Sequence, residues 1–379
     1  MAPFPTDAAA MARAVALAER GRGAVEPNPC VGAVLTTPDR RPVAEGWHAR
    51  FGGPHAEVNA LRAAGDRARG ATLFVTLEPC SHHGKTPPCA DAVIAAGVRR
   101  VVVGTRDPAP HVDGGGLAKL GAAGVEVEVG VLQQECRAVA APFFKRLRDP
   151  RHPPRPWVVA KWAMSLDGRT SARPGGPTAV SGPAAKRRTH RWRGECGAVV
   201  VGAGTARADD PHLGARPHLL DAPAARTPLR VVVGSQGALA AGSQLALTPG
   251  DGPVLVTALP GTLTFPLPGH AERLTLPPDR ADPARVDPAA LLDALADRGV
   301  YRVLLEGGGR TAGHWFDRGL VDEVRAFVAP ALFGARDAPT PMVGAGGHVR
   351  LHAVRTEPVG PDVLILGHVR DPDGWFPSR

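Results

Sequence analysis

Four residues in a short stretch of the sequence have the types and the spacing of a catalytic metal site. His55 and Glu57 stand two positions apart, and Cys80 and Cys89 follow after a predicted helix and strand. One imidazole and two thiolates give Zn²⁺ three protein ligands and leave the fourth tetrahedral position for water, as in catalytic zinc sites. Zinc lowers the pKa of such a water to about 7, so hydroxide becomes available at neutral pH. Glu57 is too close in sequence to His55 to be a comfortable fourth ligand, and we expect it to take the proton of that water.

The whole pattern distinguishes this interpretation from a simpler one, a core histidine and two buried thiols. H-x-E followed by P-C and a second cysteine is the signature of zinc nucleobase deaminases. The nucleic-acid enzymes have a short C-x-x-C form, whereas residues 81–88 separate Cys80 from Cys89 here. That loop contains His82 and Lys85, whose donors and positive charge suit a phosphate on a small substrate. The alternative for the loop is a polar surface segment.

These segments resemble the deaminase half of the bifunctional deaminase–reductases of riboflavin biosynthesis. The resemblance rests on His55-Ala56-Glu57-Val58, on residues 76–84 (TLEPCSHHG), on Thr86-Pro87-Pro88-Cys89 and on Asn28-Pro29-Cys30-Val31-Gly32. It implies a zinc ion held by His55, Cys80 and Cys89, with Glu57 as the catalytic acid and base. The substrate contacts that we expect in this half are Asn28, His82 and Lys85.

Hydrophobic periodicity predicts alternating helices and strands around these motifs. We expect helices at 7–20, 55–64, 89–96, 117–122 and 132–147, and strands at 31–35, 43–47, 71–77, 100–103 and 125–129. Such an order favours a three-layer α/β domain over residues 1–147, similar to cytidine deaminases. His55 and Glu57 then stand at the start of a helix, where they stay rigid while facing a pocket.

A second domain follows a proline-rich linker. Residues 148–156 contain four prolines and no large apolar residue, which is typical of a stiff linker. We expect the second domain over 157–370 and a loose tail over 371–379. Its predicted strands are 157–163, 198–201, 229–233, 254–256, 301–305, 324–328, 349–356 and 363–369, and its predicted helices are 183–193, 288–297 and one that ends near 318.

Two glycine-containing turns follow strands of the second domain, at 199–205 and 303–311. Glycines after a strand let backbone N–H groups approach a phosphate at a helix N-terminus. One of the turns fits a G-x-G-x-x-A pattern through Gly307, Gly309 and Ala312, but this motif alone is weak evidence for a nucleotide site. The alternative for each turn is a plain tight connection without a ligand.

The second domain resembles the reductase half of the same family. The matching segments are Lys161–Gly168 (KWAMSLDG), Ala208-Asp209-Asp210-Pro211 and Leu305-Glu306-Gly307-Gly308. The resemblance implies a dihydrofolate-reductase-like fold and NADPH, contacted by Ala163, Thr205, Asp209, Gly308, Gly309, Arg310 and Thr311. It also implies substrate contacts by Arg193, Leu213, Arg216 and Glu306, with the two arginines on the phosphate, where guanidinium groups donate in pairs. We expect Lys161 and Asp209 to handle protons. Ala179 and Gly234 depart from the family, which often has an aromatic residue and an acid there.

Composition limits the class of protein. The chain has 379 residues, a formal charge of +9 and 44% apolar residues, so two globular domains are expected. The basic residues are scattered arginines without interleaved aromatics, which weakens the case for nucleic acid. If two of the five cysteines bind zinc, the remaining three are an odd number and far apart, so no disulfide framework follows. The N-terminus has no apolar leader-like region and no stretch approaches 18 apolar residues, so a cytoplasmic location with no membrane partner is expected.

We therefore predict a bifunctional enzyme of riboflavin biosynthesis. A zinc hydroxide and Glu57 deaminate 2,5-diamino-6-(5-phosphoribosylamino)pyrimidin-4-one, and NADPH then reduces the ribosyl group of the product to ribityl. The expected partner is this small molecule, with no nucleic acid, and the resemblance implies a homo-oligomer, a dimer or tetramer. The alternatives are a nucleic-acid-editing zinc deaminase with a basic RNA-binding second domain, and a structural zinc protein.

Overall fold

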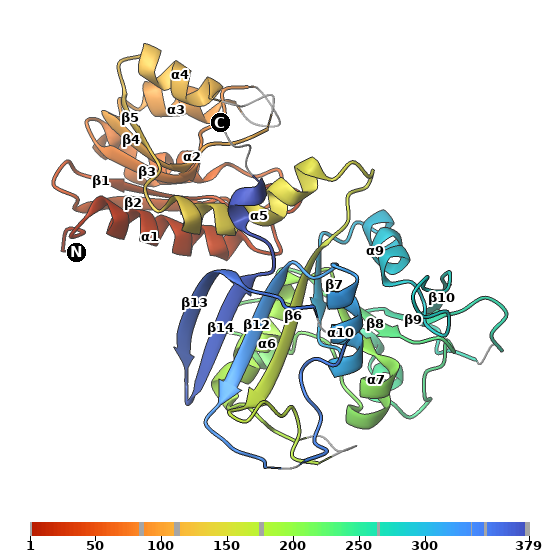
Figure 1. Cartoon of the computed structure of the whole chain (residues 1–379). Coiled ribbons are helices and arrows are strands. Elements are labelled where there is room, and N and C mark those ends of the chain that lie inside the picture. The colour runs from red at the N-terminus through yellow and green to blue at the C-terminus, as the bar shows by residue number, and fades with distance from the viewer. Residues whose placement is uncertain are drawn as a thin grey trace. The chain divides into compact units, whose positions relative to one another are not determined.

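The computed structural model describes residues 2–82, 87–109, 114–173, 178–263, 266–334, 336–344 and 347–375. The chain forms two compact units (Figure 1). The first comprises residues 1–148 together with 371–379, and the second comprises residues 149–370. Within the described residues, no helix combines the length and the apolar character needed to cross a bilayer.

The first unit contains a five-stranded mixed sheet in the order β2-β1-β3-β4-β5. Strand β1 (Gly32–Thr36) pairs antiparallel with β2 (Pro42–Trp47) and with β3 (Thr72–Leu77). Strands β4 (Arg100–Thr105) and β5 (Glu126–Val129) extend the sheet from β3 in parallel. The parallel part places the carboxyl ends of β3 and β4 at one edge, which is where the Glu78-Pro79-Cys80 segment begins.

Helices cover both faces of this sheet. Alternate residues of a strand point to opposite faces, so Leu73 and Val75 join one core cluster and Phe74 joins another. Helices α2 (Ala56–Ala64), α3 (Cys89–Ala95) and α4 (Gly115–Ala122) contribute to the first cluster, and α1 (Asp7–Ala18) contributes to the second. Helix α5 (Gln133–Arg148) contributes to both. Short 3₁₀ helices η1 (Glu19–Gly21) and η2 (Gly65–Ala68) follow α1 and α2. The predicted three-layer arrangement is therefore confirmed.

The second unit contains a nine-stranded sheet in the order β10-β9-β8-β7-β11-β6-β12-β14-β13. All neighbouring strands from β10 to β12 are parallel, and the last two pairs are antiparallel. The strands are β6 (Trp157–Ser165), β7 (Ala198–Gly202), β8 (Leu229–Val233), β9 (Val254–Ala258), β10 (Ala271–Thr275), β11 (Arg302–Leu305), β12 (Glu323–Ala329), β13 (His352–Val359) and β14 (Asp362–His368). In the parallel part, the sequences after β6, β7 and β11 emerge at one sheet edge, where ligands of α/β proteins commonly bind.

The helices of the second unit connect these strands. They are α6 (Pro183–Glu195), α7 (Ala203–Asp209), α8 (Gln244–Leu247), α9 (Pro288–Asp297) and α10 (Gly309–Asp317), with η3 (Pro217–Leu219) and η4 (Pro249–Asp251) as 3₁₀ turns. Sequence signals explain their starts: Pro183 and Pro288 stand in first turns, and the Asp287 side chain accepts a hydrogen bond from Ala289 N. Helices α7 and α8 and strand β10 were not predicted.

The end of the described chain differs from the prediction of a loose tail over 371–379. Residues Pro372–Trp375 form a 3₁₀ helix, η5, that packs against α5 in the first unit. Arg137 pairs with Asp373 at 2.7 Å, and Arg148 Nη1 donates to Gly374 O at 3.0 Å. These contacts order the segment because two basic residues of α5 meet a carboxylate and a carbonyl.

Candidate active sites

The first site begins where the chain enters α2. His55 is the extended N-cap residue of this helix and Glu57 lies in its first turn. Asn59, one turn further on, donates through Nδ2 to Trp47 O at 2.8 Å and to Pro54 O at 3.3 Å. These bonds tie the residue before His55 and the end of β2 to the first turns of α2.

Cys80 and Cys89 meet His55 in space. The three ligand atoms lie within 4.8 Å of one another. His55 Nδ1 is 3.2 Å from Cys89 Sγ and 3.7 Å from Cys80 Sγ, and the backbone N–H of Cys89 donates to Cys80 Sγ at 3.3 Å. Hydrogen bonding from Cys89, together with His55, lowers the pKa of Cys80 to about 4, which favours the thiolate that metal ions bind.

Glu78 supports the segment that carries Cys80. Its buried carboxylate accepts hydrogen bonds from Gly116 N at 3.1 Å, Leu117 N at 3.4 Å and Asp107 N at 3.3 Å. Gly116 has no room for a side chain, because a Cβ there would lie 1.8 Å from Pro79 O. The start of α4 therefore packs directly on the backbone that precedes Cys80.

The metal-ligand group opens into a cavity of about 380 Å³. His55, Glu57 and Cys80 contribute to its lining. Glu57 is only 3% exposed, and its Oε2 has no hydrogen-bond partner in the part of the chain that the structure describes. Burial raises the pKa of Glu57. A buried carboxylate oxygen facing a cavity beside one imidazole and two thiols fits a zinc ion with a water next to it.

Polar side chains for a substrate line the same cavity. Asn28 and His82 both reach it, as predicted for substrate contacts, whereas Lys85 lies outside the described residues. His48 lines it as well, and its Nδ1 lies 3.1 Å from Pro54 O. Because a carbonyl only accepts, Nδ1 carries the proton, and Nε2 is left as an acceptor 3.4 Å from Asn28 Nδ2. Burial lowers the pKa of His48, so the ring is neutral.

Helix α5 contributes a further wall of the cavity, through Phe143, Arg146 and Leu147. The guanidinium of Arg146 lies 5.5 Å from the centre of the Phe143 ring and also donates to Pro27 O. This places a fixed positive charge at the wall of the cavity.

The second site lies at the carboxyl edge of the parallel sheet in the second unit. A cavity of about 700 Å³ is lined there by Lys161 and Ala163 of β6, by Arg193 of α6 and by Glu306 directly after β11. The register puts Leu305 opposite Ala160 on one side and opposite Val200 on the other, so these strand ends are neighbours.

One carboxylate in this cavity binds two cations. Glu306 accepts from Arg193 through Oε1 at 2.7 Å and through Oε2 at 3.1 Å, and Lys161 Nζ lies 3.6 Å from Oε2. Burial alone raises the pKa of Glu306, but Arg193 and Lys161 together lower it to about 2. Burial lowers the pKa of Lys161, which Glu306 partly opposes.

The two glycine turns meet beside this triad. Gly308 N donates to Thr205 Oγ1 at 2.9 Å, which joins the turn after β11 to α7. A Cβ on Gly308 would lie 2.7 Å from that oxygen, so the close approach needs glycine. Gly308, Gly309, Arg310 and Thr311 also line an adjoining cavity of about 510 Å³, which extends past Gly234 and Ser235. Backbone N–H groups at the start of α10 and a cavity of this size fit a phosphate-bearing dinucleotide.

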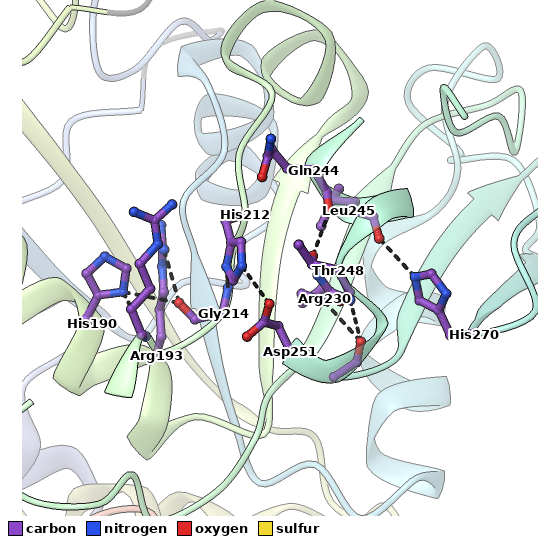
Figure 2. Close-up of polar contacts among 12 residues, drawn as sticks. His190, Arg193, His212, Gly214, Arg230, Gln244, Leu245, Thr248, Asp251 and His270 are labelled. Atoms are coloured by element: carbon purple, nitrogen blue, oxygen red, sulfur yellow. Dashed lines mark hydrogen bonds and ion pairs between the residues drawn. The ribbon is translucent and has the colours of Figure 1, made fainter. Parts of the chain in front are cut away.

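The remaining residues predicted for the second site do not all line the cavity. Asp209 and Arg216 line the larger cavity, and burial raises the pKa of Asp209. Leu213 is buried and is not part of the cavity lining. His190, which was not predicted, lines the cavity and is neutral, because burial and then Arg193 lower its pKa to about 4. Its Nδ1 lies 3.1 Å from Gly214 O (Figure 2).

The comparisons with known proteins cover both sites. Residues 5–105 match the cytidine and deoxycytidylate deaminase zinc-binding region, and residues 156–365 match the RibD C-terminal domain. The chain is 36% identical over 365 residues to the riboflavin biosynthesis protein RibD of Actinobacillus pleuropneumoniae, covering 95% of this chain and 94% of that one. It is 39% identical over 339 residues to RibD of Escherichia coli, covering 86% and 88%. The chain belongs to the RibD family.

A solved RibD structure supports the same assignment. The deaminase/reductase of Thermotoga maritima superposes with a TM-score of 0.73 at 33% identity, over 95% of this chain and 98% of that one. This RibD-family chain is therefore a riboflavin biosynthesis enzyme with a zinc-dependent deaminase domain and an NADPH-dependent reductase domain. The comparisons favour this function over the RNA-editing deaminase.

Sequence reasoning missed several residues that line the two cavities. His48, Asp107, Phe143, Arg146, His190 and His212 are examples. Phe143 and Arg146 stand three residues apart on one helix, a spacing that puts both on one face, and this was the available signal. The sequence held no comparable signal for His190 and His212, because an isolated histidine is not part of a recognisable pattern.

Because Cys89 is one of the three expected zinc ligands, its replacement by serine should have a measurable effect. We expect the variant to lose zinc and deamination together, because a serine hydroxyl is a poor substitute for a thiolate ligand. Metal analysis of the purified protein measures the first effect and ammonia release the second. The buried Cys196, in the other unit, provides a matched control, and Cys196→Ser should retain its zinc. Full zinc content in Cys89→Ser would contradict the assignment.

Proposed function

We propose that the chain carries out two successive steps on one pyrimidine ribosyl phosphate. The first removes the 2-amino group of 2,5-diamino-6-(5-phosphoribosylamino)pyrimidin-4-one, and the second reduces the ribosyl group of the resulting uracil to ribityl. The observation that carries this proposal is the convergence of His55, Cys80 and Cys89 within 4.8 Å beside the buried carboxylate of Glu57. The second cavity, with its Lys161–Glu306–Arg193 triad, supplies the place for the second step.

In the deaminase site, His55, Cys80 and Cys89 would hold Zn²⁺, which supplies a nucleophile at neutral pH by lowering the pKa of water to about 7. Glu57 Oε2 accepts the proton of the attacking water and passes it to the leaving nitrogen. One C–O bond forms, the C–N bond breaks, and ammonia leaves. Asn28 Nδ2 lies beside His48 Nε2, which can take one of its amide hydrogens, and the second hydrogen is offered to the edge of the pyrimidine.

The phosphate of the substrate needs positive charge in the same cavity. His82 and Lys85 come from the loop between the two cysteines, and Arg146 comes from α5. We assign the phosphate to this group because charged donors bind phosphate oxygens more strongly than neutral ones.

In the reductase site, bound NADPH would supply a hydride, which C1′ of the opened ribosyl group would accept. Opening breaks the bond between C1′ and the ring oxygen, and that oxygen gains one proton. Lys161 is the first candidate donor, because burial lowers its pKa, and Asp209 is the second. Arg193 and Arg216 bind the phosphate, and Thr205 with Gly308–Thr311 contacts the cofactor.

The location and assembly of the enzyme are part of this proposal. All five cysteines are among the described residues and none forms a disulfide, which agrees with a reducing cytoplasm. We also expect a homo-oligomer, and sedimentation of the purified protein measures its mass.

The proposal is tested by incubating purified protein with the diaminopyrimidinone ribosyl phosphate, with and without NADPH, and identifying the products by mass. Without NADPH we expect the product in which oxygen replaces NH, with release of ammonia. With NADPH we expect that product to gain two hydrogens. Unchanged substrate in both reactions would refute the proposal, and deamination without reduction would refute its second half, where Ala179 and Gly234 depart from the family.

A further inference from the structure

The segment that connects α7 to η3 follows an unusual path along the reductase cavity. Asp210 has φ of 40° and Leu213 has φ of 59°, so two non-glycine residues adopt the left-handed conformation within four positions. Such residues persist only where their surroundings hold them. Asp210 is held through Oδ1, which accepts from Gln244 N at 2.8 Å. The second bend needs its own support.

His212 provides that support, and both of its ring nitrogens are used. Gly214 N donates to His212 Nδ1 at 3.3 Å, so Nδ1 is the acceptor and the proton lies on Nε2. His212 Nε2 lies 2.7 Å from Asp251 Oδ2, so the ring donates to that carboxylate. The imidazole thus bridges the backbone on one side of Leu213 and a carboxylate from a distant segment (Figure 2).

Asp251 is itself held in place from the core of the sheet. It ends η4, between Thr248 and Gly252. Arg230 of β8 is completely buried and donates to Thr248 O at 2.8 Å and to Gly252 O at 3.1 Å. A third bond, to Thr248 Oγ1 at 2.7 Å, completes this clamp, which Figure 2 shows beside Asp251. The carboxylate that orients His212 is therefore anchored to the central sheet.

The other end of this network reaches Arg193, one of the two arginines assigned to the substrate phosphate. Gly214 O accepts from Arg193 Nη1 at 3.4 Å and lies 3.1 Å from His190 Nδ1, and Arg216 N donates to the same His190 nitrogen at 3.3 Å. Arg193 uses its remaining nitrogens on Glu306. A Cβ on Gly214 would lie 3.1 Å from the His212 ring and 3.3 Å from Asp251 Cβ, so the three residues pack closely. Gly214 therefore contacts the His212 ring through its N–H and Arg193 through its carbonyl.

We propose that His212, oriented by Asp251, is a positioning residue that sets the affinity of the reductase site for the phosphate of its substrate. Its imidazole fixes the backbone from Leu213 to Arg216, which places Arg193 and Arg216 at the cavity wall. The inference rests on the proposed function of these two arginines. It adds a role for His212 and Asp251, neither of which belongs to the segments that carried the family resemblance.

The test uses the whole enzyme and separates the two ring nitrogens. His212→Asn keeps an acceptor near the position of Nδ1, and His212→Gln keeps a donor near the position of Nε2, so each variant loses one of the two bonds. We expect both variants, and Asp251→Asn, to raise the KM for the phosphorylated reductase substrate by up to about tenfold, the effect of losing or weakening one hydrogen bond. The kcat and the KM for NADPH should change less than about twofold. Adding Asp251→Asn to His212→Asn should raise KM no further, because the carboxylate acts through the ring.

The controls distinguish positioning from general damage. The exposed His218 and Asp221 provide matched variants, His218→Asn and Asp221→Asn, which should retain the wild-type KM. The same substrate without its phosphate should show a KM changed by less than about twofold in every variant, since only the phosphate contacts are affected. Equal rises in KM for both substrates, or no rise for either, would overturn the inference. Absence of reduction by the wild-type enzyme would instead overturn the proposed function.

Discussion

Glu57→Gln is expected to lower the rate of ammonia release by about 10²–10⁴-fold, the usual contribution of a positioned acid and base. Glutamine has nearly the same shape but cannot accept the proton of water and pass it on. Oε2 of Glu57 is buried beside the three metal ligands, with no hydrogen-bond partner among the described residues. A coupled ammonia assay measures the loss, and metal analysis should show the same zinc content as the wild type, because Glu57 is not a ligand.

Two comparisons make this result specific. Glu45→Gln alters a half-exposed carboxylate of the same unit that pairs with Arg13, and it should leave deamination unchanged. The Glu57 variant should still reduce the deaminated substrate at the wild-type rate, since its second unit is unaltered. Ammonia release within about threefold of the wild type would show that another group transfers the proton.

The second large effect is expected for Glu306→Gln, which should reduce NADPH-dependent turnover to about 1% or less. Glu306 pairs with both Arg193 and Lys161 in the reductase cavity. Removing one partner of a buried ion pair costs about 3–5 kcal/mol, because it leaves buried charge without compensation. The loss of Glu306 should also lower the pKa of Lys161 further, because the carboxylate now raises it. NADPH oxidation at 340 nm is the conventional readout, and urea unfolding measures the stability.

The pH dependence of stability gives an independent test of this triad. The folded-state pKa of Glu306, about 2, lies below its ordinary value of 4.5. The carboxylate therefore stabilises the fold at neutral pH, and this contribution is lost as the pH falls from about 4.5 towards 2. Glu306→Gln should lack this part of the acid transition. Deamination should be unchanged, and a reductase that keeps its rate and its acid transition would contradict the role of Glu306.

The structure also shows which features the sequence could predict. The three metal ligands and Glu57 were accessible because their residue types and spacing form the H-x-E…P-C pattern of zinc deaminases, followed by a second cysteine. The strands of both sheets were accessible from their apolar runs, except β10, whose sequence is not an apolar run. Helix α7 was missed because Gly202-Ala203-Gly204-Thr205 is typical of a loop, and packing against β7 and β8 rather than propensity makes it helical.

Contacts between residues that are far apart in the sequence could not be predicted from it. His212 and Asp251 are 39 positions apart, and only the order of β7, β8 and β9 in the sheet brings them together. His48 acquires its role from the Pro54 carbonyl that fixes its tautomer. The reductase residues were predicted by resemblance, residue by residue, and the resemblance could not show that Leu213 is buried away from the cavity.

The packing of η5 on α5 has a consequence for how this enzyme is made. The polypeptide leaves the first unit at Arg148 and returns to it at Asp371, so the ribosome synthesises the whole reductase before the last piece of the deaminase exists. Until then, Arg137 and Arg148 lack the partners that they have in Asp373 and Gly374. A deaminase fragment cut at the linker would lack both of these contacts.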